Sequence, residues 1–206
     1  MTRSPLGIAN GDVEVPSHIC LMYVGDDELT RALVSFVRPA LDQAGEGVVL
    51  FGAPGVASMF LERLESSAAG RDVTAALGAG RIALTETARD VGQQVENILE
   101  AAEGLARKGL RPIRMFGRVE WDVPGFALPE DFLWCESVLN RVISRVPAIL
   151  VCVYDVTRLP ATALLLGGIE THPFVVVNGT LSTNPHFVPP ERFLSERLLQ
   201  LPWLRR

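Results

Sequence analysis

The sequence has few of the residues that define disulfide-rich and metal-binding small proteins. It contains three cysteines (Cys20, Cys135 and Cys152) and three histidines, with no HxH, HExxH or CxxC pattern. An odd number of widely spaced cysteines argues against a disulfide framework and against a zinc ribbon. His18 and Cys20 share one face of an expected strand, so packing in the core is the favoured role and a transition-metal or haem site is the alternative. We expect reduced thiols, no metal and no cofactor.

Long apolar runs and basic clusters are also lacking. No apolar stretch approaches the ~18 residues that a membrane-spanning helix needs, and the polar start Met1–Pro5 has no signal-peptide core. The chain carries 19 Lys and Arg against 24 Asp and Glu, a net charge of −5. Its densest cationic segment, Arg107–Arg111, falls at an expected helix end, where cations complement the helix dipole. The sequence therefore predicts a cytoplasmic protein that binds neither nucleic acid nor membranes directly.

Apolar segments that fit buried strands alternate with amphipathic segments that fit helices. The 206 residues, 48% of them hydrophobic, suit one domain with an ample core. The expected strands are 18–23, 47–52, 81–85, 113–121, 148–154 and 172–178. The expected helices are 26–41, 54–64, 91–108, 130–145, 161–166 (ending at Gly167-Gly168) and 190–203. Residues 66–80 are expected to be looped or partly helical, and Pro39 to kink or shorten its helix.

This alternation predicts an α/β fold with a doubly wound, mostly parallel sheet and helices on both faces. We expect a single domain over residues 1–206. Residues 1–16 are an expected N-terminal extension, and residues 190–206 an expected C-terminal helix appended to it. In such sheets, ligands bind beyond the carboxyl ends of the strands.

A nucleotide site at that edge would need a phosphate-binding loop, with converging glycine N–H groups followed by Lys and Ser or Thr. The first strand–helix turn, Tyr23–Thr30, has one glycine, no lysine and three consecutive acids, which would repel phosphates. The second turn, Phe51–Ser58, also lacks a lysine. The strand Ala148–Asp155 ends in an acid, as a Walker B strand does, although many parallel strands do so without holding magnesium. The pattern indicates an ATPase-like fold without a functional P-loop.

Charged residues lie within an expected buried strand. Arg118 and Glu120 are two positions apart and share a face, where pairing with each other limits the cost of their burial. They form either an ion pair at the wet end of the strand or a polar pair that orients a ligand beside Trp121.

The order of several short motifs resembles that of a known sensory-domain family. The series is His18-x-Cys-x-x-Tyr23, Arg114-x-x-x-Arg118-Val-Glu-Trp121, Trp134-Cys-Glu136-x-x-Leu-Asn140, Cys152-x-Tyr-Asp155 and His172-Pro. It is similar to the DcmR-type sensory domain, called MEDS, over roughly residues 17–187. The resemblance implies a degenerate relative of RecA/KaiC-like ATPases that senses a small molecule, such as a hydrocarbon derivative.

The resemblance also implies which residues line the ligand pocket. They are His18, Tyr23, Arg118, Glu120, Glu136, Asn140, Cys152, Tyr154, Asp155 and His172. Of these, Tyr154 would supply apolar contact together with Trp121, whereas Arg118, Glu120 and Asp155 would orient the ligand. Family members often carry a helix-turn-helix or kinase module, and we expect neither within these 206 residues.

We therefore expect a non-catalytic sensory domain that signals to a separate regulatory partner or through a homodimer. The helix 190–203 either packs on the sheet or presents its apolar residues to that partner. One alternative is a residual NTPase or a hydrolase that uses Asp155 or Glu120 as base. The other is an interaction module that binds no ligand.

Overall fold

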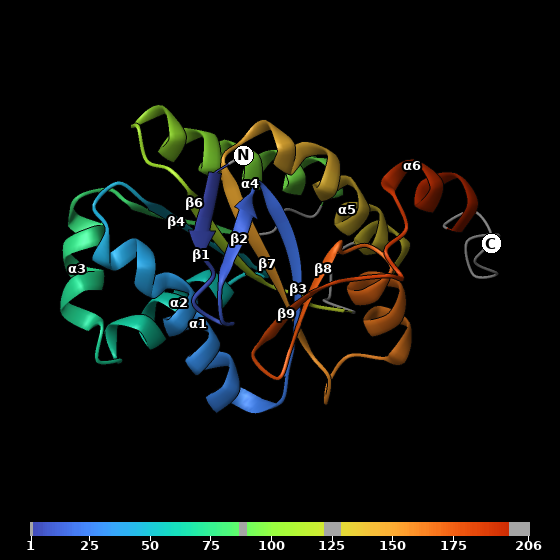
Figure 1. Cartoon of the computed structure of the whole chain (residues 1–206), viewed down its shortest axis with the longest axis horizontal. Helices are drawn as coiled ribbons and strands as arrows, with labels where there is room; N and C mark the ends of the chain where they lie inside the picture. The colour runs from blue at the N-terminus through green and yellow to red at the C-terminus, as the bar shows by residue number, and fades with distance from the viewer. Residues whose placement is uncertain (1, 87–89, 122–128, 198–206) are drawn as a thin grey trace.

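A sheet of seven strands lies at the centre of the part of the chain that the structure describes (Figure 1). The structure is a computed structural model, and it describes residues 2–86, 90–121 and 129–197. Neighbouring strands are parallel except for the last two, which are antiparallel. Their order across the sheet is β5 (Ile82–Glu86), β4 (Gly47–Gly52), β6 (Ile113–Arg118), β7 (Ala148–Asp155), β3 (Ser17–Tyr23), β8 (Phe174–Val177) and β9 (Thr180–Thr183).

Helices cover both faces of this sheet, which confirms the predicted α/β class. One face packs against α1 (Gly25–Asp42), α2 (Val56–Glu65) and α3 (Gly70–Gly78). The other packs against α4 (Val91–Arg107), α5 (Pro129–Val142), a 3₁₀ turn η1 (Ile143–Arg145) and a π-helical segment η2 (Ala163–Ile169), and we call it the α4–α5 face. The side chains of strand β7 alternate between the two faces of the sheet. Ile149, Val151 and Val153 pack in the core beneath α1–α3, and Leu150, Cys152 and Tyr154 pack in the core of the α4–α5 face.

Several predicted boundaries were wrong. Strand β6 ends at Arg118 rather than at Trp121. The segment predicted to stop before Gly167-Gly168 continues through both glycines to Ile169. A Cβ at Gly167 would lie 2.7 Å from the Phe132 ring, so this glycine permits close packing on α5 instead of ending the helix. Pro39 does not shorten α1, which runs on to Asp42.

An N-terminal hairpin lies across the α1–α3 face of the sheet (Figure 1) and was not predicted from the sequence. Its strands are β1 (Thr2–Pro5) and β2 (Asp12–Val15). The side chains of Leu6 and Val13 are buried in the core of that face. The hairpin thus covers apolar surface that the three helices leave open.

The chain after the sheet packs near α5. It forms one α-helical turn, α6 (Pro190–Arg192), followed by a π-helical segment η3 (Phe193–Arg197). Phe193 is fully buried in the core of the α4–α5 face. Leu194 is partly buried, and the apolar positions Leu198, Leu201 and Trp203 of the predicted terminal helix lie outside the described residues. Among the described helices, none has the length and apolar content needed to cross a bilayer.

Candidate functional site

The site residues predicted from the sequence fall into two groups in the structure. The first lies inside the α4–α5 face and comprises His18, Glu136, Asn140, Cys152, Tyr154 and His172. The second, which we call the edge group, lies where β3, β6 and β7 end and comprises Tyr23, Arg118, Glu120, Trp121 and Asp155. An apolar pocket lies between the two groups and contacts both.

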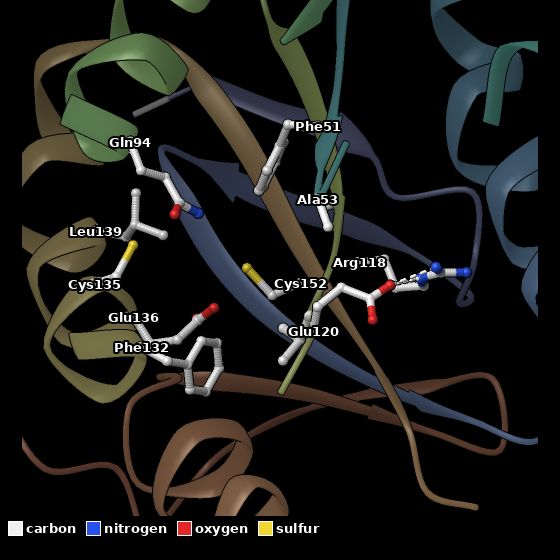
Figure 2. A pocket seen from close by; sticks show the side chains of 12 residues that line it. Phe51, Ala53, Gln94, Arg118, Glu120, Phe132, Cys135, Glu136, Leu139 and Cys152 are labelled. Atoms are coloured by element: carbon white, nitrogen blue, oxygen red, sulfur yellow. Dashed lines mark hydrogen bonds and ion pairs between the residues drawn. The ribbon is translucent and has the colours of Figure 1, made fainter. Parts of the chain in front are cut away.

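This apolar pocket opens between the sheet and helices α4 and α5 (Figure 2). It holds about 480 Å³ of empty space, part of which is open to solvent. Apolar walls come from Phe51, Ala53, Gly117, Val119, Phe132, Cys135 and Leu139. Polar groups reach it from Gln94, Arg118, Glu120, Glu136 and Cys152. Its lining, mostly apolar with a few polar groups, is of the kind found in small-molecule sites in general.

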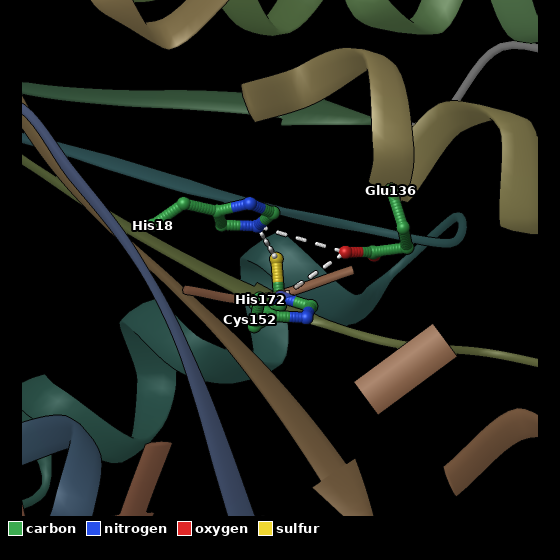
Figure 3. Close-up of side chains that lie close together, drawn as sticks. All are labelled: His18, Glu136, Cys152 and His172. Atoms are coloured by element: carbon green, nitrogen blue, oxygen red, sulfur yellow. Dashed lines mark hydrogen bonds and ion pairs between the residues drawn. The ribbon is translucent and has the colours of Figure 1, made fainter. Parts of the chain in front are cut away.

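Four side chains converge beneath the pocket, and we call them the buried cluster: His18, Glu136, Cys152 and His172 (Figure 3). His18 Nε2 lies 3.3 Å from Cys152 Sγ and 3.6 Å from Glu136 Oε2. His172 Nε2 lies 3.3 Å from the same Glu136 oxygen. All four side chains are buried, although Glu136 and Cys152 also line the pocket.

Hydrogen bonds on the far side of both imidazole rings fix how the rings are oriented. Asn140 donates its Nδ2–H to Thr171 O at 2.6 Å, which places its Oδ1 3.1 Å from His18 Nδ1 as an acceptor. The carbonyl oxygen of Gly167 lies 3.1 Å from His172 Nδ1. Both rings therefore donate an Nδ1–H outward and present the Nε2 lone pair to the buried cluster.

Burial dominates the electrostatics of the buried cluster. It lowers the pKa of His18 and of His172 to about 3, the neighbouring imidazole of His172 adding to the effect on His18. It raises the pKa of Glu136 to about 7, and it raises the pKa of the Cys152 thiol well above its usual value, aided by the Glu136 carboxylate. Glu136 Oε2 and His172 Nε2 lie 3.3 Å apart, yet neither atom has a hydrogen-bond partner among the described residues.

The edge group contains the pair that the strand spacing predicted. Arg118 and Glu120 form an ion pair at the mouth of the apolar pocket. Trp121 packs edge-to-face on Phe132, with ring centroids 5.4 Å apart. The edge group, with Arg158 and Leu159, lines a second hollow with about 330 Å³ of empty space, part of which is open to solvent. Burial, together with the nearby Asp155, raises the pKa of Tyr23 to about 12.

Tyr154, a member of the first group, is fully buried and lies outside the lining of either hollow. Its ring packs edge-to-face against Phe132 and His172, with centroid separations of 6.4 and 5.7 Å. Asp155 is engaged locally, because its Oδ1 accepts hydrogen bonds from the Thr157 backbone N–H and hydroxyl at 2.9 and 2.6 Å.

Carboxylates of the chain itself occupy the turns where a phosphate would bind. Glu28 Oε2 accepts the Val24 N–H at 2.7 Å in the first strand–helix turn. In the second turn, Glu86 Oε1 accepts the Gly55 N–H at 3.1 Å. The backbone N–H groups of Val24 and Gly55 are therefore already bound to glutamate carboxylates of the same chain.

Several pocket residues were missed from the sequence. Gln94, Phe132, Cys135 and Leu139 stand on amphipathic helices at positions that fit ordinary core packing, so their spacing gave no signal. Gly117 was also missed, although a Cβ there would lie 2.1 Å from the Phe51 ring, which shows how closely the ring approaches β6.

These features define an α/β domain with a pocket against one face of its sheet. The chain matches the family MEDS, described as the MEthanogen/methylotroph, DcmR Sensory domain, over residues 17–173. It belongs to this family, as the order of its motifs predicted, and family membership indicates a sensory role. None of the curated proteins compared with the chain matches it.

Proposed function

We propose that this chain is a non-catalytic sensory domain that binds one small, largely apolar molecule in the apolar pocket. The observation that carries the proposal is the pocket itself, which combines apolar walls with few polar groups and joins both sets of predicted site residues. The family supports a sensory role, and the pocket supports the chemistry of what is sensed.

The lining favours a molecule of a few carbon atoms with one hydrogen-bond donor. Phe51, Phe132 and Leu139 offer aromatic and aliphatic contact. The side-chain oxygen of Gln94 is buried and has no hydrogen-bond partner among the described residues. A buried oxygen without a hydrogen bond destabilises the folded protein, so a ligand hydroxyl or amine that donates a hydrogen bond to Gln94 would bind favourably in the pocket. Short alcohols and amines, derivatives of simple hydrocarbons, match these requirements.

The route to an output partner runs through α5. The helix contributes Phe132 and Leu139 to the pocket, and its Arg141 pairs with Glu191 of α6 at 3.5 Å. Phe193, just beyond α6, is buried in the same core. Ligand entry between α4 and α5 would shift α5 and so move the C-terminal segment, which we propose contacts a separate cytoplasmic regulatory protein or a second copy of the chain.

A relationship to the RecA/KaiC-like ATPases is part of the same proposal. Strand β7, which ends in Asp155, lies directly beside β3, and the turn after β3 is acidic where a phosphate-binding loop would be basic. Both features support a nucleotide-binding ancestry in which the phosphate site has been lost.

Thermal-shift titration tests the ligand proposal. We expect 1-butanol, butylamine or cyclohexanol to raise the melting temperature in a saturable way, whereas glycerol and acetate do not. Ala53→Leu fills the pocket and should abolish the shift. Ala68→Leu makes the same change at an exposed position and should retain it. The proposal fails if no apolar probe stabilises the protein, or if the two variants respond alike.

A further inference from the structure

We propose that His18, Glu136, Cys152 and His172 together bind one divalent transition-metal ion, for which zinc is the best match. This site lies beneath the apolar pocket and goes beyond the sensing proposal, since it does not depend on what occupies the pocket. The proposal differs from the sequence analysis, which predicted no metal and considered Cys20 as the partner of His18 in the alternative. In the structure, Cys152 is the cysteine that lies next to the two histidines.

Three of the six separations between the candidate ligand atoms match the edges of a tetrahedral site. Metal–ligand bonds of about 2.0–2.3 Å imply ligand–ligand distances of about 3.3–3.7 Å along the edges of a tetrahedron. The three separations given above are 3.3, 3.6 and 3.3 Å, and all four atoms lie within 4.8 Å of one another. Two imidazole nitrogens, a thiolate and a carboxylate form a donor set that zinc accepts.

The directions of these atoms point to an ion rather than to hydrogen bonds. Glu136 Oε2 and His172 Nε2 are close enough for a hydrogen bond, yet neither atom has a hydrogen-bond partner among the described residues, and Glu136 Oε2 also lies 3.6 Å from His18 Nε2. Atoms that share a metal point at the metal and not at each other. Buried polar atoms without partners destabilise the folded state, and a metal ion bound between these atoms would remove that destabilisation.

The tautomers of the histidines agree with this role. Metal-binding imidazoles use one nitrogen for the ion and donate the other N–H to a carbonyl or carboxylate. His18 donates to the Asn140 side chain and His172 to the Gly167 carbonyl, which leaves both Nε2 lone pairs inside the buried cluster. Without an ion, the Cys152 thiol would serve the lone pair of His18 and a proton on Glu136 that of His172, whereas one ion binds both lone pairs together with the thiolate and the carboxylate.

The charges also balance. The Glu136 carboxylate and the Cys152 thiolate together carry two negative charges, which a divalent ion neutralises in a site where an unpaired charge would be costly. Metal binding releases the Cys152 thiol proton to solvent, because a bound dication deprotonates a coordinating thiol despite its burial.

Metal analysis and cobalt substitution test the site. The whole chain, purified under reducing conditions from zinc-supplemented cells, should contain about one zinc per molecule. After chelation, Co²⁺ should give the strong visible bands of four-coordinate cobalt and a thiolate-to-cobalt band in the near ultraviolet. Cys152→Ser should remove the thiolate band. Cys20→Ser, at a cysteine that is equally buried but outside the buried cluster, should keep it.

Two further measurements guard against variants that misfold. X-ray absorption of the zinc-loaded wild-type protein should show three nitrogen or oxygen ligands and one sulfur around the metal, with outer-shell scattering from imidazole rings, and needs no variant. Ala53→Leu, designed to block the pocket, should bind cobalt like the wild type, so this proposal and the sensing proposal can fail separately. A six-coordinate cobalt spectrum, a metal shell without sulfur, or zinc content below a tenth of an equivalent would each overturn the site.

Discussion

Arg114 Nε lies 2.6 Å from Glu46 Oε2 in the interior of the protein, with side-chain exposures of 0% and 4%. The same guanidinium donates to Ser4 Oγ at 2.9 Å and to the Pro5 carbonyl at 2.8 Å, which ties the N-terminal hairpin to strand β6. The ion pair therefore joins three parts of the chain in a place where neither charge reaches water.

Arg114→Met should destabilise the protein by about 3–5 kcal/mol, because it leaves the Glu46 carboxylate buried without a partner. The double variant Arg114→Met/Glu46→Gln should lose less, since the stranded charge is gone. Urea unfolding measures both. Arg107→Met breaks an exposed pair with Glu103 and should cost under about 1 kcal/mol. A double variant no more stable than Arg114→Met alone would contradict this account.

Gly7 and Gly179 both have positive φ, at 84° and 71°, but only Gly7 is also crowded. A Cβ at Gly7 would lie 2.1 Å from the carbonyl oxygen of Ser35, whose usual helical donor is missing because Pro39 has no N–H. Nothing lies within 4 Å of a Cβ at Gly179. We expect Gly179→Ala to cost about 1–2 kcal/mol from backbone strain alone. Gly7→Ala should cost about 3 kcal/mol or more. Equal losses in thermal or urea unfolding would argue against the close docking of the hairpin.

The sheet was predictable because its strands are short apolar runs bounded by helical periodicity, and Ala148–Asp155 is buried along its whole length. The turn between β8 and β9 was not predicted, although its dipeptide Asn178-Gly179 is typical of a hairpin turn. Asn178 and Gly179, at φ 49° and 71°, form a two-residue connection that this dipeptide favours. The hairpin β1–β2 offered only two strands of four residues each, too short for a period to be distinguished.

The division of the site into two groups follows from strand alternation. Cys152 and Asp155 are three positions apart on β7 and so point to opposite faces of the sheet, although a motif written in sequence order places them together. Arg118 and Glu120 do pair, as their spacing predicted, although β6 ends at Arg118 and Glu120 lies beyond the strand. Glu136 and Gln94 come from helices, and no local pattern says which strand residues a helix will face. The meeting of Glu136 with His18 and His172 therefore needed the structure.

Asn140 is a positioning residue for His18. Asn140→Leu removes the acceptor of the Nδ1–H, and we expect the affinity for Zn²⁺ or Co²⁺ to fall about 10–100-fold, as is usual when the partner of a metal-binding histidine is lost. Ser137→Ala, one turn earlier on α5, removes a buried hydroxyl without a hydrogen-bond partner among the described residues and should leave affinity unchanged. Competition titration with a chromophoric chelator measures both. Unaltered affinity in Asn140→Leu would show that this contact does not hold the ring for a metal.

Gly117→Ala should push the Phe51 ring out of place, because the added Cβ would lie 2.1 Å from its Cζ. Such overpacking costs about 1–3 kcal/mol. Since Phe51 lines the apolar pocket, the thermal shift with cyclohexanol should also weaken. Gly78→Ala adds a methyl group where nothing lies within 4 Å and should leave both readouts nearly unchanged. Phe51→Leu should restore part of the stability of Gly117→Ala, and no rescue would mean that the strain is relieved elsewhere.

Mg-ATP should neither stabilise this protein nor be hydrolysed by it. Lys108 is the one lysine in the sequence, and its Nζ donates to the Gly80 carbonyl at 3.0 Å, at the amino end of β6 rather than at the carboxyl edge of the sheet. At that other edge, Asp26 pairs with Arg63 at 3.1 Å, and Glu28 accepts the Val24 N–H. A triphosphate would have to displace carboxylates without gaining a lysine, which the low dielectric of a cleft makes unfavourable.

The variant Asp155→Ala distinguishes a structural role of this carboxylate from a catalytic role. Loss of its hydrogen bonds to Thr157 should cost about 1–2 kcal/mol of stability. If Asp155 serves the turn after β7, this loss is the whole effect, and phosphate release stays at background in the variant and the wild type alike. Mg²⁺-dependent turnover in the wild type that disappears in Asp155→Ala, or a melting temperature raised by Mg-ATP, would instead make this chain a working nucleotide enzyme.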